Sequence, residues 1–409
     1  MGEDVSAGAG AELARRGPVA LVVSPHAGHA GGGAPLEALE AAGVRVGEQF
    51  VVSDLDHRLP QGAAWRARGI VAAVAAGGDG TIGAVATQVA EAGLPLGILP
   101  LGTSNDVARA LGVPLDLAGA CAALARGAPV EVDAGQVLPA ATEPGALAVE
   151  PRPRARADTD TDADTELHTA LAASGAYFVH ALTLGLNVSF ARLATDVARR
   201  QRWGSLTYAT SALEAVTRFE PVPVSLRLSE GRALGLDGIW RAARGEMEVV
   251  CRAVQVAVVN TPVFGGAMNL RVPRVDFHDR LLDFLVIEAL EPATLRETIE
   301  GLLRALEKLS ESFASRVAAL EPGDGTEKPA SWQGTTHAVS ADEPAVHALP
   351  GVRRYQARAA IIQTPRHVDV TLDGEIRAHT PAWVRIAPEP LRVLLPGRRE
   401  IRGPRDSGE

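Results

Sequence analysis

The first third of the chain alternates short apolar runs with segments in which apolar residues recur at helical spacing. The runs predict strands near residues 19–23, 44–52, 70–74, 96–100 and 130–137, and the other segments predict helices near 36–42, 82–91, 107–111 and after Pro114. Strands that alternate with helices in this way form parallel sheets covered on both faces. We therefore expect residues 17–138 to form a doubly wound parallel α/β domain.

From residue 174 onward the pattern changes to successive strands with few helices between them. The apolar runs predict strands at 177–184, 222–228, 247–259, 282–289, 352–364, 367–372 and 382–387, with helices at 190–200, 206–219 and 294–320. Strands that follow one another without crossover helices pair antiparallel. Residues 174–395 are therefore expected to form an antiparallel β-sandwich domain.

Four segments show neither the helical nor the strand pattern of apolar residues. Residues 139–173 and about 321–345 are rich in Asp, Pro, Gly, Ser and Thr, and we expect disordered inserts there, with disordered tails at 1–16 and 396–409. The alternating aspartates of the first insert resemble a calcium loop. However, Ala163 stands where such a loop needs glycine and Thr169 where it needs glutamate, so a solvated insert is favoured.

Charge and composition narrow the function. The net charge of −9 argues against general nucleic-acid binding, which requires a basic surface. No apolar run is long enough for a transmembrane segment. The two cysteines, Cys121 and Cys251, lie in apolar surroundings and indicate buried thiols in a reducing compartment. These features predict a cytoplasmic protein.

Two glycine-bearing turns follow neighbouring predicted strands. Gly77-Gly78-Asp79-Gly80-Thr81 follows the run at 70–74, and Gly102-Thr103-Ser104-Asn105-Asp106 follows the run at 96–100. Such turns, each before a helix, direct backbone N–H groups at phosphate. Asp79 would repel phosphate unless it holds a cation, accepts a proton or orients a hydroxyl group. The two turns therefore favour phosphoryl transfer over simple nucleotide binding.

Five elements in order resemble the diacylglycerol-kinase-type lipid kinases, particularly their soluble bacterial members. They are the Gly77–Thr81 loop, the segment 100–109, Asn260 with Gly265-Gly266, the segment 279–283 and Asp373-Gly374-Glu375. The resemblance covers nearly the whole chain apart from the tails and inserts. It implies an ATP-dependent kinase of lipid metabolism with Mg²⁺, in which catalysis takes place between the two domains.

The resemblance also implies roles for particular residues. Glu375 would be the general base for the lipid hydroxyl, with Asp79 as a second catalytic carboxylate. The implied metal site consists of Asp279 with the backbone carbonyls of Asp276 and Leu281. The implied nucleotide-binding residues are Ser24, Ser53, Gly77, Gly78, Asp79, Gly80, Thr81, Ile82, Gly102, Thr103, Asn105 and Asp106. Without the resemblance to this family, Asp373-Gly374 would be interpreted only as a hairpin turn.

The chain departs from similar proteins at several positions. Ser24 stands where Asn is usual, and His29 where a basic residue is usual. Gly83-Ala84 replaces a usual Asn-Glu pair, which leaves side-chain contacts to the nucleotide there open. Arg280 replaces a glycine in the metal segment, and arginine resists the positive φ that glycine accepts.

Two alternatives remain. An NAD-kinase-like or phosphofructokinase-like enzyme would share the glycine-aspartate-glycine loop, although the Gly-Thr-x-Asn-Asp setting of Asn105 favours a lipid kinase. A catalytically weak nucleotide- or lipid-binding protein is the other, and the retained Asp79, Asp106 and Glu375 favour an enzyme. The lipid and the oligomeric state are left open.

The expected partner is a lipid substrate at a membrane surface, with which the protein would associate transiently. Arg199, Arg200 and Arg202 beside Trp203 could contact anionic headgroups there. A solvated helix end, whose arginines complement the helix dipole, is the favoured interpretation of this cluster.

Overall fold

The computed structural model describes residues 13, 17–25, 35–55, 60–138, 175–186, 220–243, 245–264, 270–272, 275–291, 294, 297, 301 and 349–395. The expected inserts, nearly all of both tails, the helices at 190–200 and 206–219, most of the helix at 294–320 and the arginine cluster at 199–202 lie outside these residues. His29 and Gly265-Gly266 lie outside them as well.

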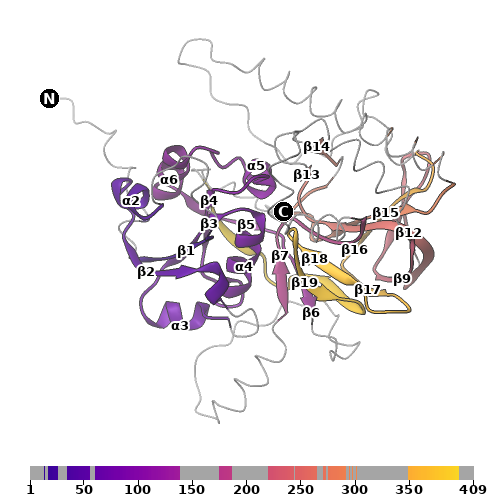
Figure 1. Cartoon of the computed structure of the whole chain (residues 1–409), viewed down its shortest axis with the longest axis horizontal. Coiled ribbons are helices and arrows are strands. Elements are labelled where there is room, and N and C mark those ends of the chain that lie inside the picture. Colours follow the sequence, from indigo (N-terminus) through magenta and orange to yellow (C-terminus); the bar gives the residue numbers. More distant parts are fainter. Residues whose placement is uncertain are drawn as a thin grey trace, which may run out of the picture.

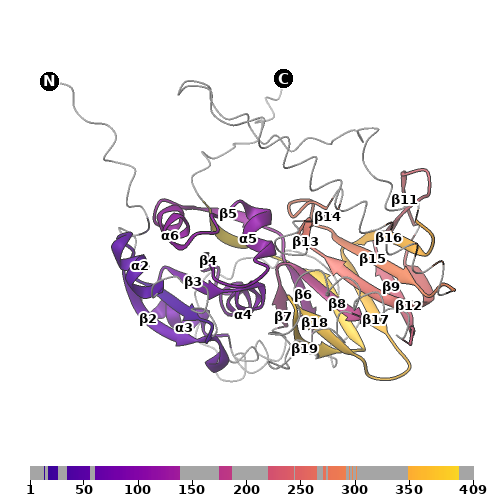
Figure 2. The ribbon, with the colours of Figure 1, turned by 45° about the horizontal axis from the view of Figure 1, so that its top comes forward.

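The N-terminal part is built on a six-stranded sheet in the order β2-β1-β3-β4-β21-β5, flanked by helices. Its strands are β1 (Val19–Val23), β2 (Val46–Val51), β3 (Ala72–Gly77), β4 (Leu96–Pro100), β5 (Ala128–Val132) and β21 (Leu391–Leu395). Its helical elements are α2 (Pro35–Ala41), η2 (Val52–Asp54), α3 (Gly62–Ala67), α4 (Asp79–Val89), α5 (Asp106–Leu111) and α6 (Leu117–Ala125). Helices α2 and α6 cover one face and α3 and α4 the other (Figure 2). The doubly wound α/β prediction is confirmed.

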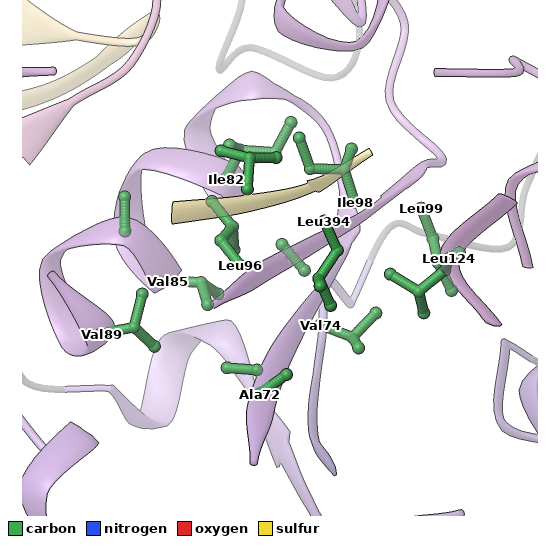
Figure 3. Close-up of a cluster of buried hydrophobic side chains, with 14 of the residues drawn as sticks. Ala72, Val74, Ile82, Val85, Val89, Leu96, Ile98, Leu99, Leu124 and Leu394 are labelled. Carbon is green, nitrogen blue, oxygen red and sulfur yellow. The ribbon is translucent and has the colours of Figure 1, made fainter. Parts of the chain in front are cut away.

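The core of this domain follows from the two-residue period of its strands. Leu96 and Ile98 of β4 lie on the side of α4, where they meet Ile82, while Leu99 lies on the side of Leu124 from α6 (Figure 3). Gly97 leaves room for Leu124, because a β-carbon at Gly97 would lie 2.4 Å from its Cδ1. Alternate residues of one strand thereby pack against two helices, one on each face of the sheet (Figure 3).

The C-terminal part is an antiparallel sheet of thirteen strands, curled on itself around a second core. Its strands are β6 (Gly135–Leu138), β7 (Ala176–Phe178), β8 (Ala181–Gly185), β9 (Val222–Ser229), β10 (Arg232–Leu234), β11 (Trp240–Ala242), β12 (Met247–Val259), β15 (Leu282–Glu288), β16 (Val352–Ala357), β17 (Ala359–Gln363), β18 (Asp369–Leu372), β19 (Glu375–His379) and β20 (Ala382–Ile386). Strands β13 (Val263–Phe264) and β14 (Leu270–Arg271) form a separate pair. The predicted β-sandwich is confirmed (Figure 1).

Three predicted strands are wrong in that each is two strands. The run at 130–137 breaks after Val132, and β5 and β6 belong to different sheets. The run at 177–184 breaks at residues 179–180 into β7 and β8, and the run at 352–364 breaks at Arg358 into β16 and β17. Apolar alternation continues across each break, so the pattern alone cannot show where a strand changes partners.

The last strand, β21, is not among the strands that the sequence predicts. β21 returns from the C-terminal part and inserts between β4 and β5, where it appears as a yellow strand among purple elements (Figure 1). The chain therefore passes between the two sheets twice, once after β5 and once after β20. Both passages matter for the candidate site, because they fix how the sheets face each other.

Candidate functional site

The first glycine turn is tighter than the sequence predicts. Strand β3 continues through Gly77 and α4 already begins at Asp79, so Gly78 is the only residue between them. A β-carbon at Gly77 would lie 2.3 Å from Oγ1 of Thr81. The turn can therefore place Thr81 inside the first helical turn only because Gly77 has no side chain.

The second glycine turn lies directly against the first. A β-carbon at Gly102 would come 2.3 Å from the α-carbon of Gly78. Asn105, with φ of 53°, shapes this turn: its side chain accepts a bond from the Gly102 N–H and donates to the carbonyl oxygens of Gly102 and Pro100. The Asn105 side chain thus maintains the turn. The two glycines give the turns a shared backbone surface.

Asp79 connects the two turns. Its carboxylate accepts hydrogen bonds from the backbone N–H groups of Asp106 (3.1 Å) and Val107 (2.9 Å) at the start of α5. A carboxylate is favoured at a helix N-terminus, because it satisfies N–H groups that have no partner within the helix. Asp79 therefore caps α5 as well as standing in the first turn.

A hairpin of the C-terminal sheet faces these turns. Asp373 and Gly374, with φ of 51° and 86°, form the predicted turn between β18 and β19. The buried Asp373 carboxylate accepts backbone N–H bonds from Val179 (3.0 Å), His180 (2.8 Å) and Ala181 (3.0 Å), which fix the break between β7 and β8. Burial raises the pKa of Asp373 to about 7, against the lowering effect of these three bonds.

Helix α4 presents two glycines to this hairpin. A β-carbon at Gly83 would lie 2.2 Å from Oδ2 of Asp373, and one at Gly80 would lie 2.3 Å from Oε1 of Glu375. Gly83, which departs from the usual Asn, therefore leaves room for the Asp373 carboxylate. Because Gly80 and Gly83 are one helical turn apart, both hairpin acids pack against the same face of α4.

Glu375 is held by an arginine of its own strand. The side chain of Glu375 is 54% exposed, and its Oε2 accepts from Nη2 (2.5 Å) and Nε (3.1 Å) of Arg377. Arg377 is only 8% exposed and also donates to the carbonyl oxygen of Gly80 at 2.7 Å. The guanidinium group therefore joins the hairpin to the first glycine turn. An accessible carboxylate results, beside the turn expected to hold phosphate.

A buried histidine lies behind the two turns. His180 Nδ1 is 2.7 Å from Oγ1 of Thr261, and its Nε2 is 3.8 Å from Oδ2 of Asp106. Burial lowers the pKa of His180, while the nearby charge of Asp79 acts in the opposite direction. Sequence reasoning missed His180, because a lone histidine in an apolar run carries no distinguishing pattern.

The remaining predicted nucleotide-binding residues fall into two groups. Ser24 follows β1 at the same sheet edge, and its N–H donates to the carbonyl of Ala76 at 3.0 Å. Thr103 is exposed, as is Ser53, which lies in η2, two residues beyond the end of β2. Ile82 differs: its side chain is fully buried in the core (Figure 3) and its N–H donates to Gly78. That placement leaves the Ile82 side chain no access to a nucleotide.

The predicted metal segment keeps its turn despite Arg280, which adopts a φ of 59°. Oδ1 of Asp279 accepts from the N–H of Leu281, and burial together with the charges of Asp283, Asp276 and Asp133 raises the pKa of Asp279 to about 7. A carboxyl group among other acids suits a hard cation, with backbone carbonyls and water as further oxygen ligands. No cluster of three His, Cys, Asp or Glu side chains exists in the part of the chain that the structure describes.

As to membrane contact, a helix long and apolar enough to cross a bilayer is absent from the described parts of the chain.

Comparisons with known proteins agree with this geometry. Residues 18–137 match the family model of the diacylglycerol kinase catalytic domain, and residues 181–307 match a C-terminal NAD kinase beta sandwich-like domain. A probable lipid kinase of Stenotrophomonas maltophilia is 28% identical over 74% of this chain and 81% of its own length. A diacylglycerol kinase of Mycobacterium tuberculosis is 26% identical over 93% and 96%. Some matches are local; one, 47% identical, spans 60 residues and 14% of the relative's length.

A solved structure shows the same fold. The crystal structure of a candidate diacylglycerol kinase from Bacillus anthracis str. Sterne superposes with a TM-score of 0.53 at 18% identity. The superposition covers 92% of this chain and 95% of that one. The likeness therefore extends over both sheets.

Proposed function

Because the chain belongs to the diacylglycerol-kinase-type family of lipid kinases, we propose that the residues where α4 meets the β18–β19 hairpin transfer the γ-phosphoryl group of ATP to a lipid hydroxyl group. The acceptor is a diacylglycerol-like or sphingoid lipid. The single observation that carries the proposal is the position of the Glu375 carboxylate, which lies against Gly80 of the first glycine turn.

The two glycine turns hold the phosphates of the nucleotide. The N-terminus of α4 has no side-chain cap, so its backbone N–H groups and its dipole can act on an anion. The contact between Gly78 and Gly102 allows one phosphate chain to touch both turns. Asp79 keeps the turns together through its bonds to α5, and Arg377 supplies positive charge at Gly80.

Glu375 takes the proton of the attacking hydroxyl. As the lipid oxygen forms its bond to the γ-phosphorus, the bond to the bridging oxygen breaks and ADP leaves, while the hydroxyl proton passes to the Glu375 carboxylate. Arg377 orients this carboxylate through two bonds, so that one oxygen of Glu375 faces Gly80. Phosphoryl transfer needs mainly such positioning and charge neutralisation.

Magnesium belongs to the same proposal. Mg²⁺ would neutralise phosphate charge during transfer, and the Asp279 turn would hold an ion through its carboxylate and the carbonyls of Asp276 and Leu281. The proposal also places the protein in the cytoplasm and, because the acceptor is a membrane lipid, transiently at a membrane surface.

The experiment is incubation of the purified protein with radiolabelled ATP, Mg²⁺ and a mixed lipid extract, followed by chromatographic identification of the labelled product. Label in a phosphorylated long-chain alcohol supports the proposal, and its structure names the lipid. Label transferred instead to NAD or a sugar phosphate in parallel reactions would support a small-molecule kinase. ATP binding without transfer to any acceptor would support a binding protein.

A further inference from the structure

The two passages of the chain between the sheets lie next to each other. Asp133 follows β5 in the first passage, and Ala387 and Pro388 follow β20 in the second. The passages are bonded directly through the Ala387 N–H and the carbonyl of Ala134, at 2.8 Å. A third segment, residues 277–281 before β15, packs against both. This joint therefore contributes to the relative placement of the two sheets.

Arg280 contacts both passages with one side chain. Its Nη1 donates to Oδ1 of Asp133 at 2.9 Å, and its Nη2 donates to the carbonyl oxygens of Ala387 (2.5 Å) and Pro388 (2.9 Å). The backbone N–H of Arg280 also donates to Oδ2 of Asp133 at 2.7 Å. Asp133 is 2% exposed and Arg280 28%, so the pair is largely shielded from water.

Arg280 makes these contacts from a backbone conformation that is unfavourable for arginine. Its φ of 59° lies in the left-handed region, which disfavours side chains other than those of Asn and Asp. Among the residues that the structure describes, two of the three other non-glycine residues with positive φ, Asn105 and Asp373, are of that tolerant kind. Glycine would adopt this turn without strain. The strain at Arg280 is therefore offset by what its side chain does.

We infer that Arg280 is a covalently attached cation that clamps the two passages together, so that the joint between the sheets persists without an ion bound at the Asp279 turn. The guanidinium group neutralises the buried Asp133 carboxylate and satisfies two carbonyl oxygens, as a bound metal ion would. Unlike a metal ion, it cannot be removed by a chelator. The inference concerns the joint alone and holds whichever acceptor the enzyme phosphorylates.

Replacement of Arg280 by glycine should change the melting temperature in opposite directions, depending on whether the Arg280 side chain acts as a clamp or is merely tolerated in the turn. If the side chain only tolerates the turn, Arg280→Gly removes backbone strain and raises the melting temperature by about 2 °C. If the side chain is a clamp, the same change removes the cation that pairs with the buried Asp133 carboxylate and lowers the melting temperature by at least about 5 °C. We expect the decrease, measured by calorimetry on the full chain.

Three further measurements complete the test. Arg280→Ala keeps the strain and loses the clamp, so it should melt below Arg280→Gly. Arg68→Ala, which removes an exposed pair with Glu48, is the matched control and should shift melting by about 2 °C or less. A chelator should shift the wild-type midpoint by less than about 1 °C. An Arg280→Gly variant that melts above the wild type would overturn the inference. So would a chelator that lowers the melting temperature of the wild type as much as the Arg280→Gly substitution does.

Discussion

The carboxylate of Glu375 lies against the α-carbon of Gly80, so closely that a β-carbon there would come within 2.3 Å of Oε1. Gly80 lies in helix α4, which packs on the first sheet, whereas Glu375 begins strand β19 of the second sheet, and Arg377 bonds to both residues. The contact brings the proposed base to the start of α4, where the phosphates are expected. The catalytic geometry therefore depends on a glycine at a helix terminus.

Gly80→Ala tests this contact. Alanine favours helices over glycine by about 1 kcal/mol, so helix propensity alone would stabilise the variant. The added methyl group should instead displace Glu375 and reduce kcat by about a hundredfold, because displacement of a catalytic group by about 1 Å has that effect. Steady-state kinetics measures the loss, and circular dichroism checks the fold. Full activity in Gly80→Ala would show that the proximity of Glu375 to Gly80 is not required.

Gly83→Ala probes the neighbouring contact with Asp373. Its β-carbon would lie 2.2 Å from Oδ2 and would disturb the three backbone N–H bonds that this carboxylate accepts. We expect a loss of about 1–3 kcal/mol in the free energy of unfolding, typical of overpacking. Denaturant titration measures it. Combining the change with Asp373→Ala should cost less than the sum of the two, and strict additivity would contradict the contact.

Asp79→Asn should lower both turnover and stability. One oxygen of Asp79 would become an amide group facing the N–H of Asp106 or Val107, and a buried donor left unsatisfied costs about 1–3 kcal/mol. The sequence alone predicts a catalytic effect with little change in folding, because the cap on α5 cannot be seen there. Kinetics and denaturant titration of the same sample separate the two effects. Unchanged stability would show that the cap contributes nothing.

The sequence predicts the two sheets and the glycine turns well, because both depend on local periodicity and on glycine. It predicts the Asp373–Gly374 turn for the same reason. It cannot show that β21 returns to the first sheet or that Asp133 marks a passage between sheets, since those facts depend on pairing over long distances. The roles of His180, Arg280 and Arg377 also depend on partners far along the chain, so no spacing rule identifies them.

The buried His180 predicts a pH dependence of stability. Burial lowers its pKa in the folded state below the ordinary value of about 6.5, so the unfolded chain binds the proton more readily. The contribution of the neutral His180 to the free energy of unfolding is therefore complete above about pH 6.5 and is lost as the pH falls toward the folded-state pKa. The stability difference between wild type and His180→Asn should shrink between about pH 7.5 and pH 5.5.

Thr261→Val is the matched control, because it removes the partner of the His180 ring without removing a titrating group. Its stability should run nearly parallel to that of the wild type over the same pH range. Denaturant titration at each pH measures all three proteins. A constant difference between wild type and His180→Asn would contradict a buried neutral histidine.

The most direct measurement for the whole account is the turnover number of Glu375→Gln in phosphoryl transfer from radiolabelled ATP to the lipid acceptor. Glutamine keeps the size of the side chain and one oxygen that can accept from Arg377, but it cannot take a proton. We predict a kcat at least about a hundredfold lower, with ATP affinity and melting temperature retained. Glu131→Gln, on the exposed face of β5, is the control and should keep full activity. Near-normal turnover in Glu375→Gln would contradict the assignment of the base and leave residues 373–375 as a hairpin turn alone.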